Sequence, residues 1–318
     1  MSTVSVIIPT YHRPEMLRRA VASVLAQELR DATFEVIIGV SDRDSSEDRM
    51  VATELTAADS RVRMTVAERL GPAAARNAAM AAASGDIFAF TDDDCEAAPG
   101  WLQAGVDLLA RVDFVQGRTV LKEARANVMV KNRVVERFSG SWEACNLFVR
   151  RSAVDRVGGF DEEWNPTGRP ERPWGEDMPW GWGLVRAGAT YDFEPRAEVR
   201  HAIRERTYRQ LLRDKLDIRF YPLMVRREPE VRRGFYGRYF LNRQHALITV
   251  SLGVLGAAAV AAVKGSPWLA LAGFVPAIAM GLSPPRTRIA MTIPQTVNDW
   301  INYVMLVYGS IRYRRLVL

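Results

Sequence analysis

Short apolar runs rich in β-branched residues alternate with helix-like segments in the first third of the chain, and this alternation limits the folds open to it. The strand-like runs cover residues 4–8, 34–40 and 86–91, and the helix-like segments cover residues 17–26 and 73–83. This order predicts an α/β fold in which helices cover both faces of a parallel sheet. Ligands of such sheets bind in the crevice beyond the carboxyl ends of the strands.

Polar residues follow each of the three predicted strands, at residues 10–13, 41–44 and 92–94. Because parallel strands end at the same edge of a sheet, we expect these segments to converge. No GxGxxG or GxxxxGKS/T motif follows any of the strands, so neither a dinucleotide cofactor nor P-loop chemistry is supported. From residue 114 to residue 197 the pattern loosens, which predicts loops shaped around a substrate.

Three consecutive aspartates, Asp92, Asp93 and Asp94, stand at the end of the third predicted strand. Like charges this close raise one another's pKa unless a cation neutralises them. Mg²⁺ or Mn²⁺ suits the cluster because hard cations bind carboxylate oxygens and bridge to substrate phosphates. In an extended segment Asp92 and Asp94 project to one side, so we expect both to face a metal–diphosphate complex and Asp93 to point away. The alternative is a solvated acidic turn.

The formal net charge of the chain is +6, and many of its arginines lie between residues 196 and 243. A basic surface attracts nucleic acid, anionic lipid and nucleotide diphosphates alike, so charge alone does not choose among these partners. Only Cys95 and Cys145 are present, which argues against a structural zinc site or a disulfide framework and indicates a reducing compartment. The N-terminus shows no signal-peptide pattern, which predicts that the bulk of the chain is cytoplasmic.

Two uncharged runs, residues 246–263 and 267–283, have about the length that spans a bilayer and are separated by a turn that contains Lys264. They predict a transmembrane helical hairpin. The arginines that flank it are Arg238, Arg243, Arg286 and Arg288. The positive-inside rule therefore places both flanks in the cytoplasm. The alternative is a buried helical hairpin in a soluble domain.

Four segments within residues 1–201 form an ordered set of motifs. They are Val6-Ile7-Ile8-Pro9-Thr10-Tyr11-His12-Arg13, Gly71-Pro72-Ala73-Ala74-Ala75-Arg76-Asn77, Asp92-Asp93-Asp94 followed by Pro99 and Trp101, and Gly158-Gly159-Phe160-Asp161-Glu162 followed by Gly175-Glu176-Asp177. They resemble the nucleotide-binding loop, the Ala-Arg-Asn segment, the DxD motif and the acceptor-side motifs of the family 2 glycosyltransferases. These are inverting enzymes with the A-type nucleotide-diphospho-sugar transferase fold.

The resemblance implies a donor site for a nucleotide-diphospho-sugar. Pro9, Tyr11 and Arg13 would contact the base and ribose. Asp42 would take the uracil-side carboxylate position, where family members commonly show two adjacent acids, and a UDP-sugar is the favoured donor. The further residues with an implied role in nucleotide-sugar binding are Arg76, Asp92 and Asn146.

The resemblance also implies a metal site and an acceptor side. Asp92, Asp94 and His201 would bind Mg²⁺ or Mn²⁺, which stabilises the departing diphosphate. Asp177 would be the catalytic base that removes the proton of the acceptor hydroxyl. The acceptor-side residues expected around it are Trp174, Glu176 and Trp180. A start-of-helix position that favours the helix dipole is the alternative for Glu176, and a structural role is the alternative for His201.

The expected activity is a metal-dependent, inverting transfer of one sugar to a hydroxyl of a saccharide or glycolipid acceptor, in cell-surface glycan or glycolipid synthesis. Asp214 follows Gln210 and Arg213, so the Gln-x-x-Arg-Trp signature of processive synthases is incomplete. We expect an inner-membrane enzyme with a cytoplasmic catalytic domain and no nucleic-acid partner. The alternatives are a polyprenyl-phosphate sugar synthase or nucleotidyltransferase of the same fold, or a non-catalytic membrane-anchored binding protein.

The predicted domain organisation has four parts. Residues 1–201 form the catalytic domain, with the A-type glycosyltransferase fold of a Rossmann-like mixed sheet flanked by helices. Residues 202–243 form a basic helical extension, and residues 244–285 form the two-helix transmembrane hairpin. Residues 286–318 form a C-terminal tail, either as an interfacial amphipathic helix or packed against the catalytic domain.

Overall fold

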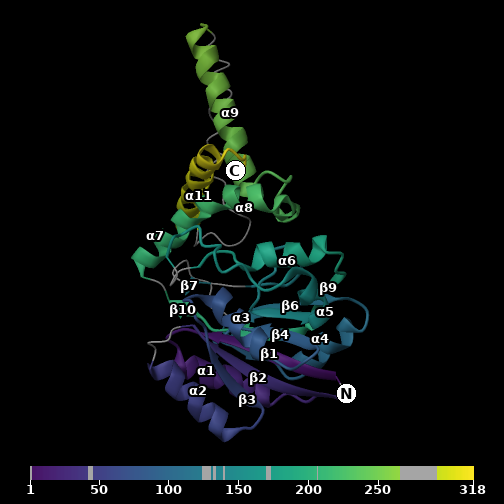
Figure 1. Ribbon diagram of the computed structural model, residues 1–318. Coiled ribbons are helices and arrows are strands. Elements are labelled where there is room, and N and C mark those ends of the chain that lie inside the picture. Colours follow the sequence, from purple (N-terminus) through teal and green to yellow (C-terminus); the bar gives the residue numbers. More distant parts are fainter. Residues whose placement is uncertain are drawn as a thin grey trace. The chain divides into compact units, whose positions relative to one another are not determined.

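The computed structural model describes residues 2–41, 46–123, 130–131, 134–138, 140–169, 173–205, 207–265 and 292–318. Two compact units divide the chain: residues 1–126 with residues 130–205, and residues 127–129 with residues 206–318. The first unit holds the β-sheets, and the described part of the second unit is built mainly of helices (Figure 1). All the strand ends that the sequence marks as a ligand site therefore belong to the first unit.

An eight-stranded sheet forms the centre of the first unit, in the order β3-β2-β1-β4-β8-β6-β9-β5. Its first four strands are β3 Val62–Val66, β2 Ala32–Val40, β1 Ser2–Thr10 and β4 Ile87–Thr91. These strands run parallel, and Ile7 of β1 pairs with Phe90 of β4. The carboxyl ends of β1 and β4 therefore lie side by side, as the strand–helix pattern predicts.

The second half of the sheet is mixed. Its strands are β8 Asn146–Arg150, β6 Phe114–Leu121, β9 Tyr191–His201 and β5 Cys95–Ala97. β8 runs antiparallel to β4 and β6, whereas β9 runs parallel to β6 and antiparallel to β5. A short separate sheet pairs β7 Val130–Lys131 with β10 Arg204–Glu205. The expectation of loops throughout residues 114–197 was therefore wrong, because β6, β8 and β9 lie in this segment. The sequence did not reveal β9 because buried and exposed side chains mix along it and leave no apolar run.

Helices cover both faces of the large sheet. They are α1 Pro14–Leu25, α2 Ser46–Ala58, α3 Pro72–Ala82, α4 Trp101–Leu109, α5 Arg151–Val157 and α6 Asp177–Arg186. Leu17 of α1 and Trp101 of α4 share a core cluster with Ile38 of β2. Gly39 faces the other side of β2, and a Cβ atom there would collide with the backbone of Ala75 in α3. Gly39 thus allows α3 to lie close against the sheet.

The sequence pattern missed α2 and β3, which lie between the second and third predicted strands. Of the five residues of β3, only Val62 is fully buried, and α2 buries only Asp48, Val51 and Ala52. Both elements lie near the edge of the sheet, so their apolar periodicity is weak. The predicted strands and helices on either side of them are confirmed, and the observed order is βαβαβαβ up to Thr91.

The second unit contains α7 Tyr208–Asp217, η1 Ile218–Phe220, α8 Tyr221–Arg227, η2 Pro229–Gly234, α9 Arg243–Val263 and α11 Thr292–Tyr313. The start of α7 is fixed by a capping box in which Thr207 and Gln210 exchange hydrogen bonds. α11 approaches η1 closely, because Gly309 has no side chain to strike the carbonyl of Arg219. α7, η1, α8 and η2 fall within residues 202–243, the segment expected to be a basic helical extension.

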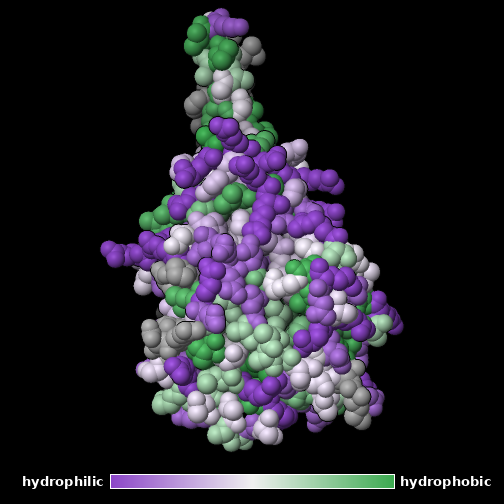
Figure 2. All heavy atoms as spheres, in the orientation of Figure 1, coloured by the Kyte–Doolittle hydropathy of each residue, from purple (hydrophilic) through white to green (hydrophobic). Residues whose placement is uncertain are grey.

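α9 is the one helix in the described part of the chain that is long and apolar enough to cross a membrane. At 1.5 Å per residue, its 21 residues extend for roughly 30 Å, about the thickness of a bilayer core. Asn242 caps its start by accepting a hydrogen bond from the His245 amide at 2.9 Å. Figure 2 shows apolar side chains, in green, along this helix. The second apolar run, residues 267–283, lies outside the described residues.

Candidate active site

The ends of β1 and β4 are joined through Asp93. Its carboxylate accepts hydrogen bonds from Thr10 Oγ1 at 3.0 Å and from the Tyr11 amide at 3.3 Å. The side chain of Asp93 is buried, and Arg13 Nη1 lies 2.7 Å from its other oxygen. Burial raises the pKa of Asp93 and the charge of Asp92 adds to this effect, whereas Arg13 opposes it. The predicted convergence of these two strand ends is therefore observed.

The three aspartates lie in a turn rather than in an extended segment, because the Cys95 amide donates to the carbonyl of Asp92 at 3.1 Å. Strand alternation therefore does not decide where they point, and that part of our reasoning was wrong. Asp92 pairs with Arg76 at 2.8 Å, whereas Asp94 lies 3.2 Å from Arg13 Nη1. The three carboxylates consequently have different surroundings, although they are adjacent in sequence.

Arg13 is held in place by Asp48, a residue that the sequence reasoning missed. The two carboxylate oxygens of Asp48 accept from the amides of His12, at 2.5 Å, and Arg13, at 3.0 Å. His12 has a φ of 52°, in the left-handed region that non-glycine residues rarely adopt. The fully buried Asp48 stands in the first turn of α2, so the loop after β1 depends on a helix that the pattern did not reveal.

Arg76 connects the aspartate turn to the acceptor-side motif. It is only 3% exposed, and its guanidinium lies 2.8 Å from Asp92 and 3.1 Å from Glu176. Burial alone would lower the pKa of Arg76, but the charges of Asp92, Asp177 and Glu176 outweigh it and raise the pKa. The buried Nε atom of Arg76 has no hydrogen-bond partner among the described residues. Arg76 therefore spans the two halves of the predicted site as a permanent cation.

Glu176 and Asp177 stand at the start of α6, with both side chains buried. Burial and the charge of Asp177 raise the pKa of Glu176 to about 7, against the attraction of Arg76. Asp177 Oδ2 accepts a hydrogen bond from the Ala144 amide at 2.9 Å. That bond orients the carboxylate. The two neighbouring acids thus have different partners: Glu176 pairs with Arg76, and Asp177 accepts from the Ala144 amide.

His201 lies beside Asp94 because β5 and β9 pair with Cys95 opposite His201. Its Nδ1 atom is 2.8 Å from the Ala202 carbonyl, and its Nε2 atom is 3.5 Å from Asp94 Oδ1. Candidate ligand atoms of Asp94, Cys95 and His201 all lie within 4.8 Å of one another. A hydrogen bond with Cys145, together with burial, raises the pKa of the Cys95 thiol. The carboxylate and imidazole are the donors of this group that suit Mn²⁺.

Two predicted site residues, Asn146 and Trp180, make their contacts in the interior of the protein. The Asn146 amide is fully buried and bonds to Trp101 Nε1, the Arg118 carbonyl and the Ala197 carbonyl, at 2.8 to 2.9 Å. Trp180 is buried, with its ring stacked on Phe160 at a centroid distance of 4.2 Å. These contacts favour packing roles over the donor-side role predicted for Asn146 and the acceptor platform predicted for Trp180.

The remaining predicted residues have less distinctive surroundings. Pro9 is buried in β1, and Tyr11 is partly exposed with its ring against that of His12. Trp174 is partly buried, and its carbonyl accepts from Trp164 Nε1 at 3.0 Å. Asp42 lies outside the described residues.

Asn77, which received no role from the sequence, ties α3 to the segment after α5. Its side-chain amide donates to the Phe160 carbonyl at 2.9 Å and accepts from the Phe160 amide at 2.8 Å. A Cβ atom at Gly159 would collide with Asn77. The Ala-Arg-Asn and Gly-Gly-Phe-Asp motifs therefore pack against each other. In this arrangement the guanidinium carbon of Arg76 lies 5.4 Å from the centroid of the Phe160 ring.

Comparison with known proteins agrees with this arrangement. Residues 5–161 match the family model described as "Glycosyl transferase family 2". The glycosyltransferase AglE of Haloferax volcanii is 29% identical over 171 residues, covering 49% of this chain and 55% of AglE. A GalNAc(5)-diNAcBac-PP-undecaprenol beta-1,3-glucosyltransferase of Campylobacter jejuni is 35% identical over 105 residues, covering 32% of this chain and 33% of that enzyme. The chain thus spans about half or less of the length of these relatives.

The fold is also similar to that of a solved structure, the mannosyltransferase PcManGT from Pyrobaculum calidifontis in complex with GDP-Man and Mn²⁺. The TM-score is 0.61, with 20% identity over 98% of this chain and 86% of that protein. The mixed sheet with flanking helices is the A-type glycosyltransferase fold. With the family model, the relatives and the fold in agreement, the chain belongs to the family 2 glycosyltransferases.

Proposed function

We propose that this protein transfers one sugar from a nucleotide-diphospho-sugar to a hydroxyl group of an acceptor, with inversion at the anomeric carbon. The observation that carries the proposal is the Arg76 bridge, which links Asp92 at the strand-end edge to Glu176 beside Asp177. A donor group at the edge and an acceptor group at α6 would thus be held in one fixed geometry. Positioning of this kind contributes much of the rate enhancement in group transfer.

On the donor side, Asp94 and His201 would hold Mg²⁺ or Mn²⁺, with Asp92 supplying a further carboxylate. The side chain of Asp92 is 26% exposed, whereas that of Asp94 is 2% exposed. When bound, the cation supplies a Lewis acid that stabilises the leaving diphosphate. Arg13 lies 2.7 Å from Asp93 and 3.2 Å from Asp94, so it offsets part of the negative charge of the cluster.

On the acceptor side, Asp177 would remove the proton from the attacking hydroxyl. Its Oδ2 atom is engaged by the Ala144 amide, which leaves Oδ1 to accept from the acceptor. Glu176 would support this role by holding the guanidinium of Arg76, at 3.1 Å, beside the start of α6. Inversion follows from a single displacement, in which the base and the leaving diphosphate lie on opposite faces of the sugar.

We further propose a UDP-sugar as donor and a saccharide or glycolipid as acceptor, at the inner membrane with the catalytic unit in the cytoplasm. The apolar α9 supports a membrane location, and the Campylobacter relative is named for a lipid-linked acceptor. A polyprenyl-phosphate acceptor is the second candidate, because lipid-linked chemistry suits the same location. It differs in needing no base, since a phosphate is already ionised.

The test is a product analysis of the full chain in detergent with UDP- and GDP-sugars, with Mn²⁺ or with EDTA. We expect metal-dependent transfer that Asp177→Asn abolishes while donor binding is retained. The matched control is Asp155→Asn, which removes an exposed aspartate of α5 and should leave turnover unchanged. Turnover by Asp177→Asn with a polyprenyl phosphate as acceptor would replace the hydroxyl-transfer proposal with the second candidate.

A further inference from the structure

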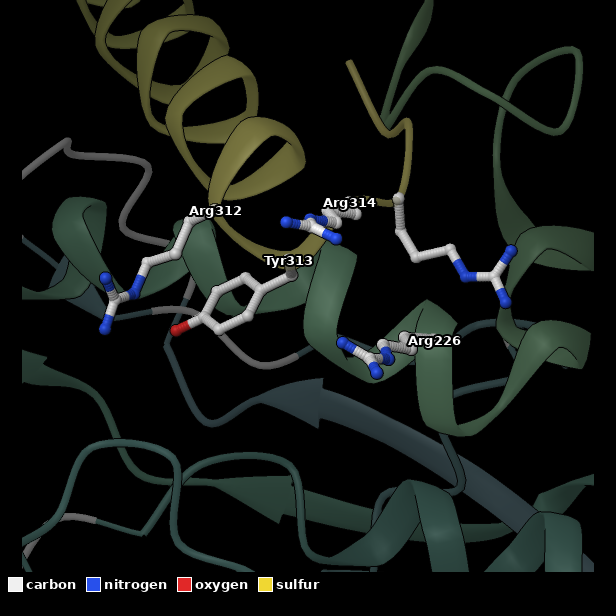
Figure 3. Close-up of a pocket in the computed structure, with 5 residues that line it drawn as sticks. Arg226, Arg312, Tyr313 and Arg314 are labelled. Atoms are coloured by element: carbon white, nitrogen blue, oxygen red, sulfur yellow. The ribbon is translucent and has the colours of Figure 1, made fainter.

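A basic hollow of about 340 Å³ lies within the second unit. The residues that line it are Arg226, Arg312, Tyr313, Arg314 and Arg315. Figure 3 shows that Arg226 comes from α8 whereas the other labelled residues come from the end of α11 and the chain directly after it. We call these five residues the arginine pocket. Its lining draws four arginines from two parts of the second unit.

Carboxylates in the described ranges do not pair with the arginines of the pocket. The neighbouring Arg227, in contrast, lies 3.3 Å from Glu228. Burial and the charge of Arg315 lower the pKa of Arg232 nearby, against the effect of Tyr239. Arg232 and Arg315 therefore repel each other, and an anion bound between the cations would reduce this repulsion.

The backbone of the pocket is held firmly although it leaves the helix. The amides of Arg314 and Arg315 donate to the carbonyls of Ile311, at 3.4 Å, and Ser310, at 3.1 Å, which is the pattern that ends many helices. Arg314 occupies the left-handed position of this pattern, with a φ of 51°, where glycine is usual. The helix dipole favours cations here, but it does not account for an arginine in this strained position or for Arg226 on α8.

The pocket is tied to the segment that leads into the apolar helix α9. After Arg315, the Leu316 carbonyl accepts from Arg232 at 2.7 Å. Leu318 exchanges hydrogen bonds with that segment, donating to the Tyr239 carbonyl at 2.8 Å and accepting from the Leu241 amide at 2.7 Å. Because α9 begins at Arg243, these bonds hold the pocket close to the point where the apolar helix starts.

Exposed apolar and aromatic side chains accompany the arginines. Ile311 is 74% exposed and Leu316 is 52% exposed, on either side of the pocket residues in the sequence. Tyr236 and Tyr239 are each about half exposed on the segment before α9. Aliphatic residues, tyrosines and arginines in this combination are typical of the interface between lipid headgroups and acyl chains.

We propose that the arginine pocket binds the phosphate of an anionic membrane lipid. The four arginines supply charge-assisted donors for phosphate oxygens, Ile311 and Leu316 lie against the acyl region, and α9 sets the depth. This site is separate from the sugar-transfer chemistry and stands whether or not the proposed function holds. It orients the second unit on the bilayer through a specific headgroup rather than through a diffuse basic surface.

The experiment titrates the full chain, purified in a neutral detergent, with dioctanoyl phosphatidylglycerol, with dioctanoyl phosphatidylcholine and with inorganic phosphate in separate arms, using calorimetry. The two lipids share the phosphate diester and acyl chains, but only the first has a net negative charge. We expect phosphatidylglycerol to bind at least about fivefold more tightly than phosphatidylcholine, and inorganic phosphate to bind more weakly than phosphatidylglycerol. Equal binding of the two lipids by the unaltered chain would overturn the proposal without any variant.

Variants then locate the site. Arg226→Gln and Arg314→Gln should each weaken phosphatidylglycerol binding by roughly fivefold, and Arg226→Lys should retain most of it. The control, Arg213→Gln, removes the same charge from an exposed position on α7 and should bind as the unaltered chain does. An equal loss of phosphatidylglycerol affinity in Arg213→Gln would mean that the lipid is attracted by the basic surface as a whole. If inorganic phosphate bound as tightly as the lipid and lost affinity in the same variants, the ligand of the pocket would be a soluble anion. Either result rejects the lipid site.

Discussion

His201 places its Nε2 atom 3.5 Å from Oδ1 of Asp94, across the antiparallel pairing of β5 with β9. The Ala202 amide also donates to the Asp94 carbonyl at 2.7 Å, so backbone bonds fix the distance between the two side chains. The second ring nitrogen of His201 is engaged by the Ala202 carbonyl at 2.8 Å. Metal-binding histidines commonly engage their second ring nitrogen with a backbone carbonyl in this way, which fixes the ring and leaves Nε2 for the metal.

We expect His201→Gln to weaken Mn²⁺ binding by about tenfold or more, because the variant loses an oriented nitrogen ligand. Electron paramagnetic resonance of free Mn²⁺ during titration measures the affinity directly. Asp155→Asn is the control, since it removes a charge without touching the strand-end cluster. Unaltered Mn²⁺ affinity in His201→Gln would remove this residue from the metal site.

We expect Arg76→Met to lower the free energy of unfolding by roughly 3 to 5 kcal/mol, because it leaves the buried Glu176 and the partly buried Asp92 without their cation. Arg69→Met is the matched control: its pair with Glu163, at 3.4 Å, is exposed and should contribute about 1 kcal/mol or less. Denaturant titrations of the two variants provide the comparison. Similar losses in both would contradict the bridging role of Arg76.

The stability of the protein should depend on pH through Glu176. Its pKa is about 7 in the folded protein and 4.5 ordinarily, so the folded state binds this proton more tightly than the unfolded state does. The stabilisation by protonated Glu176 is therefore complete below pH 4.5 and is lost as the pH rises toward 7, on the order of 1 to 3 kcal/mol. Thermal unfolding of Glu176→Gln across pH 5 to 8 should show a flatter profile. A profile as steep as that of the unaltered chain would assign the dependence to another group.

Asn146→Ala tests whether Asn146 supports the interior or the donor. The substitution leaves the Trp101 indole N–H and the carbonyls of Arg118 and Ala197 without their hydrogen bonds to Asn146. We therefore expect the free energy of unfolding to fall by about 2 to 4 kcal/mol. The KM for the nucleotide-sugar should change by less than about threefold in the folded fraction. A large rise in KM with little loss of stability would instead restore the donor-side role.

Strong local patterns predicted the parts of the fold that are buried on both sides. β1, β2 and β4 were found because Val4, Ile38 and Phe90 belong to continuous apolar runs in the centre of the sheet. β3 and α2 were missed because they are partly exposed, and β9 because buried and exposed side chains mix along it. The mixed half of the sheet depends on pairings such as Phe114 with Tyr191, which no local periodicity records.

The candidate site shows the same division. The strand-end rule placed the loop after β1 beside Asp93, and the resemblance placed His201 beside Asp94. The turn at Asp92, the carboxylate of Asp48 behind Arg13 and the burial of Trp180 required three-dimensional contacts. A tryptophan gives the same signal in the sequence whether its side chain lies in the core or faces a sugar.

The guanidinium of Arg76 bonds to both Asp92 and Glu176, so a change at one of these two residues affects the other in evolution. A substitution that changes the charge around Asp92, which we propose binds the donor, also changes how strongly Arg76 stabilises the ionised form of Glu176. Related enzymes that acquire a new sugar donor through this residue should therefore show a displaced pH optimum, even when every acceptor-side residue is unchanged.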